Sequence, residues 1–273
     1  MNIFNTLLVY PLANGLVLFY NILFQNLGLA IIAFTSALKL ATNPLTKPYM
    51  QSMKKMKELE PLLAKLKERH QGDKTKYLQA QSDLYKQKGI NPGAGCLPYI
   101  LQIIILIAFF SMFNKVLVPG GNPVETLNTM LYPPLQFAAD TVINTQFLWM
   151  NLTKPDTFTV PGLPFALPGL LLVLAALFQF VSAKMMAPYQ KEEEKLAKKT
   201  PGAKDDIQVS MQKSMIYTFP LFTLIIGLRF PSGLALYWLL FSFWQAAQQY
   251  QTSGWGGLTP FAKRIGIVKS PEK

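Results

Sequence analysis

The side chain in this sequence that stands out as a candidate for chemistry is a lysine inside a hydrophobic stretch. Lys39 lies in the segment FTSALKLATNPL, Phe34–Leu45, and no charged side chain precedes it in the sequence. A cation in the middle of a membrane helix costs about 2.5 to 3.5 kcal/mol on insertion scales, so such a charge indicates a function. The chemistry that an ammonium group offers there is electrostatic attraction of water or of an acidic group.

Covalent and metal chemistry have little support in the sequence. Cys96 is the only cysteine and His70 the only histidine, and they lie far apart in the chain. The apolar stretches contain no Asp or Glu that could complete a metal site or a nucleophile with its base. We therefore predict no metal, no cofactor and no enzymatic activity.

Other polar residues lie at a similar depth in the apolar stretches. Each alone is typical of a hydrogen bond between helices, but together they could line a wet recess around Lys39. Lys39 could instead extend its side chain toward the membrane surface near Lys47. The sequence alone does not decide between the recess and the surface for Lys39, or between the recess and bonds between helices for the other polar residues. These residues are Thr35, Ser36, Gln102, Gln179, Ser242 and Gln245.

Composition predicts a membrane protein. The 273 residues are 51% hydrophobic and only 15% charged, which is too apolar for an ordinary soluble domain. The formal net charge is +12, but the basic residues fall in blocks between apolar runs and no nucleic-acid recognition motif accompanies them. We therefore expect no specific DNA binding.

Five apolar stretches predict an all-α integral membrane protein with five transmembrane helices. A spanning helix needs roughly 17 to 25 residues, and the last apolar block is split by the turn sequence RFPSG into two short spans. Within residues 1–24, Pro11, Asn14 and Gly15 interrupt the apolar run, which favours an interfacial N-terminal helix over a membrane span. The first residues lack the features of a cleaved signal, so we expect the N-terminus to be retained. The predicted spans are 27–46, 97–115, 164–186, 214–229 and 232–250.

The distribution of Lys and Arg orients these spans. Residues 43–95 contain eleven basic residues, 184–213 seven and the tail after Gln251 four, whereas 116–163 contain only Lys154. The positive-inside rule then places the N-terminus outside and the C-terminus in the cytoplasm of a multi-pass cell membrane protein. The predicted connecting segments are an extracytoplasmic loop at 116–163, a cytoplasmic loop at 187–213 and a basic cytoplasmic tail at 251–273.

Residues 47–91 predict a cytoplasmic helical hairpin. Its first arm has apolar residues at spacings of three and four on a lysine-rich helix. A hairpin packed only on itself would explain this narrow stripe, while flexible methionines could also contact lipid headgroups or passing chains. The candidate contact residues are Met50, Met53 and Met56. The basic tail favours anionic lipid or ribosomal RNA as a neighbour.

Three motifs resemble the YidC-type membrane protein insertases, whose relatives work in mitochondria and chloroplasts. The similarity extends from about Leu7 to Tyr250, nearly the whole chain. It is carried by LYKQKGINPGAGCLPYILQ (Leu84–Gln102), FLWMNLTKPD (Phe147–Asp156) and GLRFPSGLALYWLLFSFWQAAQQY (Gly227–Tyr250).

The resemblance implies a substrate groove that is open to the cytoplasm and closed to the outside. Lys39 falls where the family carries a groove arginine, and Thr35, Gln102 and Gln179 fall on matching polar positions. Lysine keeps the charge but loses the planar bidentate grip of arginine on a carboxylate. The sequence III after Gln102 also replaces a proline that the family often has. The resemblance places a hydrophobic slide at Ile103, Leu106 and Phe165, with Trp238 and Trp244 on the terminal span.

We therefore expect an insertase and chaperone that transfers polar segments of nascent membrane proteins into the bilayer. Its expected partners are nascent membrane proteins and the lipid bilayer, with the Sec translocon and the ribosome as further candidates. A small transporter or channel is the alternative, but it would need a continuous polar path, and the outer halves of the first three spans show no matching polar line.

Overall fold

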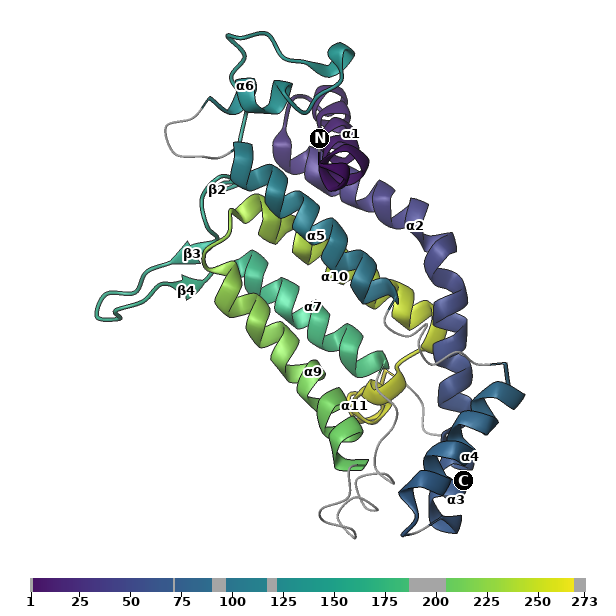
Figure 1. The fold of residues 1–273 in the computed structure, drawn as a ribbon. Coiled ribbons are helices and arrows are strands. Elements are labelled where there is room, and N and C mark those ends of the chain that lie inside the picture. Colours follow the sequence, from purple (N-terminus) through teal and green to yellow (C-terminus); the bar gives the residue numbers. More distant parts are fainter. Residues whose placement is uncertain (1, 71, 90–96, 117–121, 187–204, 268–273) are drawn as a thin grey trace. The chain divides into compact units, whose positions relative to one another are not determined.

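The computed structural model describes residues 2–70, 72–89, 97–116, 122–186 and 205–267, and these residues are predominantly helical (Figure 1). This agrees with the predicted all-α class, to which the structure adds two very short β-hairpins. The elements are, in chain order, η1 (Asn5–Val9), α1 (Tyr10–Ile22), α2 (Leu27–Glu58), α3 (Glu60–Arg69), α4 (Lys74–Gln87), α5 (Leu97–Val116), α6 (Pro123–Asn128), η3 (Pro133–Leu135), β1 (Gln146–Phe147), β2 (Met150–Asn151), β3 (Thr157–Phe158), β4 (Leu167–Pro168), α7 (Leu170–Met186), α9 (Asp205–Gly227), α10 (Ser232–Ser253), η4 (Gly256–Leu258) and α11 (Thr259–Arg264).

The chain forms two compact units. Unit 1 contains Met1–Thr42, Tyr99–Phe178 and Pro220–Trp244, and unit 2 contains Asn43–Pro98, Gln179–Phe219 and Gln245–Lys273. Each predicted span overlaps a helix with other bounds, and among the described helices only the stretch Leu27–Pro44 is long and apolar enough to cross a membrane. Shorter apolar helices occupy Ile103–Phe113, Leu170–Met185 and Ile216–Gly227, so the count of five spans stays a prediction.

Aromatic side chains join three helices in the core of unit 1. Phe109 of α5 stacks on Tyr237 of α10 with 4.5 Å between ring centroids, and it lies 6.1 Å from the ring of Phe34 on α2. Phe34 also lies directly against Gly15 of α1, where any Cβ atom would overlap its ring. The glycine therefore lets α1 approach α2 closely, and burial of these rings stabilises the packing of the four helices.

The N-terminal segment is helical in η1 and α1, and Pro11, Asn14 and Gly15 all lie within α1. Pro11 lies in the first turn of α1, directly after η1. Asn14 is buried, and its amide donates to the carbonyl oxygens of Tyr10 (2.8 Å) and Met130 (3.0 Å) and accepts from the N–H of Tyr132 (2.7 Å). Asn14 thus fastens the loop after α6 to α1.

The loop segment Asn151–Asp156 fixes the starts of two helices. The N–H groups of Ser232 and Gly233, at the start of α10, donate to the carbonyl oxygens of Lys154 (2.7 Å) and Leu152 (2.9 Å). The Ser232 hydroxyl adds a 3.0 Å bond to the carbonyl of Asn151. These bonds satisfy N–H groups that a helix leaves without intrahelical partners in its first turn.

The same segment also determines where α7 begins. The buried carboxylate of Asp156 accepts the N–H of Leu172 (2.9 Å) and lies directly against Gly169. Strand β4 pairs with β3 immediately before this point, so the helix starts at Leu170 and not at Pro164, where the predicted span begins. A negative side chain there also interacts favourably with the helix dipole.

Unit 2 contains the predicted hairpin as helices α3 and α4. The helical arm is divided at Leu59, because Pro61 in the first turn of α3 cannot continue a preceding helix. Asp73 caps α4 by accepting the N–H of Lys76 at 3.0 Å. Elsewhere in this unit, Gln248 of α10 donates to the side-chain oxygens of Asn43 (2.7 Å) and Thr46 (2.8 Å) on α2.

Candidate functional site

The site of Lys39 lies inside unit 1, between α2 and α10. The residue is only 9% exposed, and its Nζ atom lies 3.6 Å from the centre of the Phe241 ring. An ammonium group over an aromatic face is attracted by the ring quadrupole, and the attraction grows when water is excluded. In the structure, the Lys39 side chain therefore lies buried between the helices. It does not extend to the membrane surface near Lys47.

A small cavity of about 10 Å³ lies beside the Lys39 side chain. This volume is at the lower limit of what one water molecule needs. The Thr35 hydroxyl is buried, and it has no hydrogen-bond partner among the described residues. It can therefore bond to a water molecule or to a visiting polar group. The residues around the cavity, which we call the Lys39 recess, are Thr35, Leu38, Lys39, Thr42, Ile105, Tyr237 and Phe241.

Ser36 and Trp244 meet next to the Lys39 recess. The indole Nε1 of Trp244 donates to Ser36 Oγ at 3.0 Å, while the Ser36 hydroxyl donates to the carbonyl of Ile32 at 2.8 Å. This bond joins α10 to α2. Ser36 therefore takes the role of an interhelical hydrogen-bond partner, and Trp244 uses its polar end to hold the two helices that carry Lys39 and Phe241.

Ser242 is buried on α10 directly after Phe241. Its hydroxyl donates to the carbonyl of Trp238 in its own helix at 2.7 Å. Gln179 belongs to unit 2, and the side chain of Gln102 lies outside the described residues, so their place in a groove stays a prediction. The side chains of the hairpin methionines Met50, Met53 and Met56 also lie outside the described residues.

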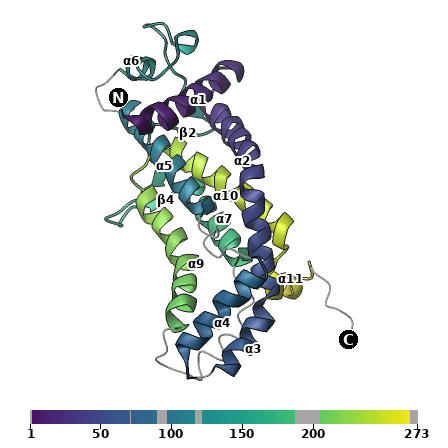
Figure 2. The same cartoon turned by 45° about the vertical axis from the view of Figure 1, so that its right-hand side comes forward.

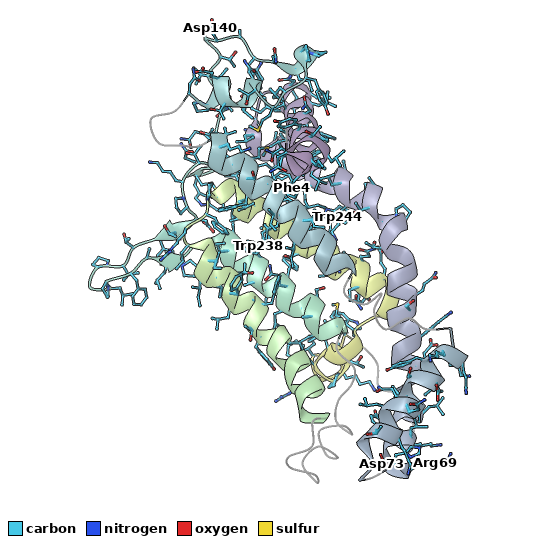
Figure 3. All side chains as sticks on the ribbon, in the orientation of Figure 1. Phe4, Arg69, Asp73, Asp140, Trp238 and Trp244 are labelled. Carbon is cyan, nitrogen blue, oxygen red and sulfur yellow. The ribbon has the colours of Figure 1, made fainter. Side chains whose placement is uncertain are left out.

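The residues predicted for a hydrophobic slide differ in exposure. Ile103 and Phe165 are 45% and 59% exposed, and Leu106 is half-buried. Trp238 is only 2% exposed, and its ring lies 6.4 Å from that of Phe230. Both tryptophans, Trp238 and Trp244, come from α10 (Figure 3). The surface available to an apolar chain at these positions is thus formed by α5 and by the loop before α7.

Phe241 and Tyr237 are site residues that the sequence reasoning missed. Both lie on α10 one turn apart and line the Lys39 recess. The signal that could have found them is the aromatic run YWLLFSFW, because a cation in an apolar stretch without Asp or Glu favours an aromatic partner. The described residues contain no group of three His, Cys, Asp or Glu side chains that could hold a metal ion.

Comparison with known proteins identifies the family to which the chain belongs. The family model described as 60Kd inner membrane protein matches residues 17–255. A protein named membrane protein insertase YidC from Fusobacterium nucleatum is 32% identical and covers 82% of this chain and 85% of its own. Membrane protein insertase YidC 2 of Bacillus anthracis is 29% identical over 92% of this chain and 82% of its own.

A longer relative aligns over only part of its length. Membrane protein insertase YidC of Chlorobium luteolum is 31% identical over 83% of this chain, which spans 33% of that relative. The matched family model covers well over half of the present sequence, and its range includes all three motifs that carry the resemblance. The chain therefore belongs to the family of the 60Kd inner membrane protein, the family of the YidC membrane protein insertases.

Proposed function

We propose that this protein inserts nascent membrane proteins into the bilayer by passing their polar segments through a groove that opens to the cytoplasm. Family membership supports the general activity. The observation that supports the mechanism is the buried ammonium of Lys39 next to a small cavity and to the Thr35 hydroxyl, which has no hydrogen-bond partner in the described part of the chain. Insertion makes and breaks no covalent bond, so it needs neither a catalytic residue nor a cofactor.

The Lys39 recess would lower the barrier for an acidic segment. A carboxylate that leaves water for hydrocarbon pays a large desolvation cost, and a fixed positive charge nearby offsets part of it. Thr35 and a water molecule beside Lys39 would supply hydrogen bonds to the same carboxylate. Gln102, Gln179 and Ser242 complete the proposed groove at the positions that the sequence predicts.

The apolar part of the client would move along the outer surface of α5. Ile103 and Ile107 lie one turn apart on this helix and are 45% and 49% exposed. Exposed aliphatic side chains suit contact with lipid chains and with an apolar helix equally well, so a client could leave this surface for the bilayer without losing contacts. Phe165, at 59% exposure, extends the proposed slide into the loop before α7.

We extend the proposal to topology and partners. The basic segments would lie in the cytoplasm with the C-terminus, and the N-terminus outside, as the positive-inside rule requires. The hairpin α3–α4 and the basic tail would then face the source of nascent chains, which makes the ribosome and the Sec translocon candidate partners.

Insertion in proteoliposomes tests the mechanism. We expect Lys39→Gln to reduce insertion of a single-span client with an acidic translocated tail several-fold, while a client with a neutral tail is affected less. Lys39→Arg should retain activity, because the charge that attracts the carboxylate remains. Lys115→Gln is the matched control, since it removes an exposed lysine from α5.

Two results would contradict the proposal. Equal loss for acidic and neutral tails would exclude charge attraction by Lys39. Flux of ions or solutes through the protein, in the absence of client insertion, would favour the alternative of a transporter or channel.

A further inference from the structure

A second and much larger cavity lies in unit 1, outside the Lys39 recess. Its volume is about 320 Å³, and its walls come from α1, the start of α2, the last turns of α5, α6, the loop that precedes β1 and the residues directly after β2. In both views of the ribbon, α1 and α6 lie near the end of α5 (Figures 1 and 2). Large apolar side chains form most of the wall, among them Leu16, Val17, Met112, Phe113, Leu127 and Phe137.

Several polar groups at this cavity are already bonded within the protein. The Tyr20 hydroxyl accepts the N–H of Asn144 at 2.9 Å, and the Thr153 hydroxyl donates to Asn151 Oδ1 at 2.7 Å. The side-chain oxygen of Asn122 accepts the N–H groups of Val124 (3.1 Å) and Glu125 (3.3 Å). None of the described residues that line the cavity is charged. An ion, a sugar or a peptide backbone would therefore lose more hydrogen bonds to water than it gains here.

The size of the cavity further limits the class of molecule that could bind there. An apolar cavity of about 150 Å³ in another protein stays free of water and binds benzene, and the present cavity is about twice as large. A flexible hydrocarbon chain fits such a space, whereas a transmembrane helix with a diameter of about 10–12 Å does not. In a membrane protein the abundant molecules of this chemistry are the lipids of the bilayer.

We propose that this cavity binds one acyl chain of a bilayer phospholipid. The chain would fill the space between α1 and α6 and so hold the N-terminal helix to the loop that carries Asn151–Asp156. The site shares no lining residue with the Lys39 recess, and the inference is independent of the proposed insertion mechanism. Loss of lipid at the cavity and loss of client insertion are therefore separate outcomes.

Photocrosslinking in nanodiscs tests this assignment. The probe is a phosphatidylcholine with a diazirine at the end of one acyl chain, used without any client. We expect labels on the cavity residues Leu16, Val17 and Leu127, in addition to labels on the exposed residues Ile103 and Ile107, which face the surroundings on α5. A diazirine fatty acid in a parallel sample distinguishes a phospholipid chain from a free one.

Variants that fill the cavity sharpen the test. Ala13→Leu and Val124→Phe each add carbon atoms to a lining position, and they should reduce cavity labelling several-fold while Ile103 and Ile107 keep theirs. Ala41→Leu, at an exposed position of α2, is the matched control and should change nothing. The two substitutions lie on different walls of the cavity, so the test remains valid if one of the variants misfolds.

The assignment would be overturned by any of three results. The first is the absence of cavity labels in the wild-type protein, and the second is labelling that persists at full strength in both filled variants. The third is labelling of the cavity by the free fatty acid alone, which would make the ligand something other than a bilayer phospholipid.

Discussion

Two regions of unit 1 differ in whether their buried polar groups have hydrogen-bond partners. In the segment Asn151–Asp156, carbonyl oxygens and a buried carboxylate bond to the first N–H groups of α7 and α10. In the Lys39 recess, the Thr35 hydroxyl is buried without a partner among the described residues, and a cavity adjoins it. Buried polar groups are normally paired, so the first region follows the rule and the second departs from it.

We interpret this difference as one between a structural role and the functional role that we propose for the Lys39 recess. Paired groups at the start of two helices lower the free energy of the folded state. A buried hydroxyl without a partner beside a buried cation raises it, and such a cost is found at sites where a ligand binds. We therefore expect substitutions in the two regions to change thermal stability in opposite directions.

Asp156→Ala should cause the largest loss of stability. The substitution leaves the N–H of Leu172 unpaired in a buried place, which we expect to cost about 2–3 kcal/mol of unfolding free energy. Thermal unfolding in lipid nanodiscs measures the effect. Asp140→Ala is the control, because Asp140 is an exposed carboxylate of the same loop (Figure 3). Equal midpoints for the two variants would show that Asp156 does not stabilise α7.

Lys39→Met should raise stability while it lowers insertion of clients with acidic tails. Methionine is close to lysine in length and removes a costly buried charge, although the contact with Phe241 is also lost. The net expectation is a gain of about 1 kcal/mol in unfolding free energy. The same unfolding assay measures it, with Lys115→Met as the exposed control. A loss as large as that of Asp156→Ala would mean that Lys39 has a structural role.

Trp244→Phe should have a smaller effect. Phenylalanine keeps an aromatic ring on α10 but cannot donate to Ser36, so we expect a loss of about 0.5–1 kcal/mol. Trp149→Phe, at a residue that is 67% exposed, provides the comparison. Combining the substitution with Ser36→Ala then gives a double-mutant cycle. Strictly additive effects would show that the bond between α2 and α10 contributes no coupling energy.

The smallest expected effect is an acid dependence of the hairpin in unit 2. The backbone N–H of Lys76, followed by its side chain, lowers the pKa of Asp73 below its ordinary value of 3.8. The ionised cap therefore stabilises α4 fully above pH 3.8, and this contribution is lost as the pH falls through the lowered pKa.

Hydrogen exchange at the amide of Lys76 measures this loss. Relative to the intrinsic exchange rate at each pH, the protection of this amide should decrease as the pH falls through the lowered pKa of Asp73 in the wild-type protein, and Asp73→Asn should remove this decrease. Asp83→Asn on the same helix should leave it unchanged. A transition that survives in Asp73→Asn would assign the acid dependence to another group.

The sequence predicted the helices and the buried cation but not the contacts that place them. Lys39 could be found because a charge inside an apolar run is visible in the chain itself. Its contact with Phe241 joins residues about two hundred positions apart, and periodicity carries no information about such pairs. The bonds of Asn151–Asp156 use backbone carbonyls, which every residue possesses, so residue types cannot reveal them.

The sequence also could not show what Gly15 contacts. It predicted a helix over residues 1–24, but the close packing of Gly15 against Phe34 joins two helices and is not visible in the order of residues. The start of α7 at Leu170 was likewise hidden, since it depends on the pairing of β3 with β4 and on the remote carboxylate of Asp156. In both places tertiary contacts decide the role of a residue.

The hydrogen bonds from Asn151–Asp156 to both α7 and α10 also determine where foreign sequence can be added to the segment between α5 and α7. One extra residue between Leu152 and Lys154 would pull their carbonyl groups out of register with Ser232 and Gly233, and the displaced Asp156 would leave α7. The tip of the β3–β4 hairpin is free of such ties: Gly162 is exposed, and a Cβ atom there would meet open space. An epitope or fluorophore for topology mapping belongs at this tip, in a flexible linker of several residues.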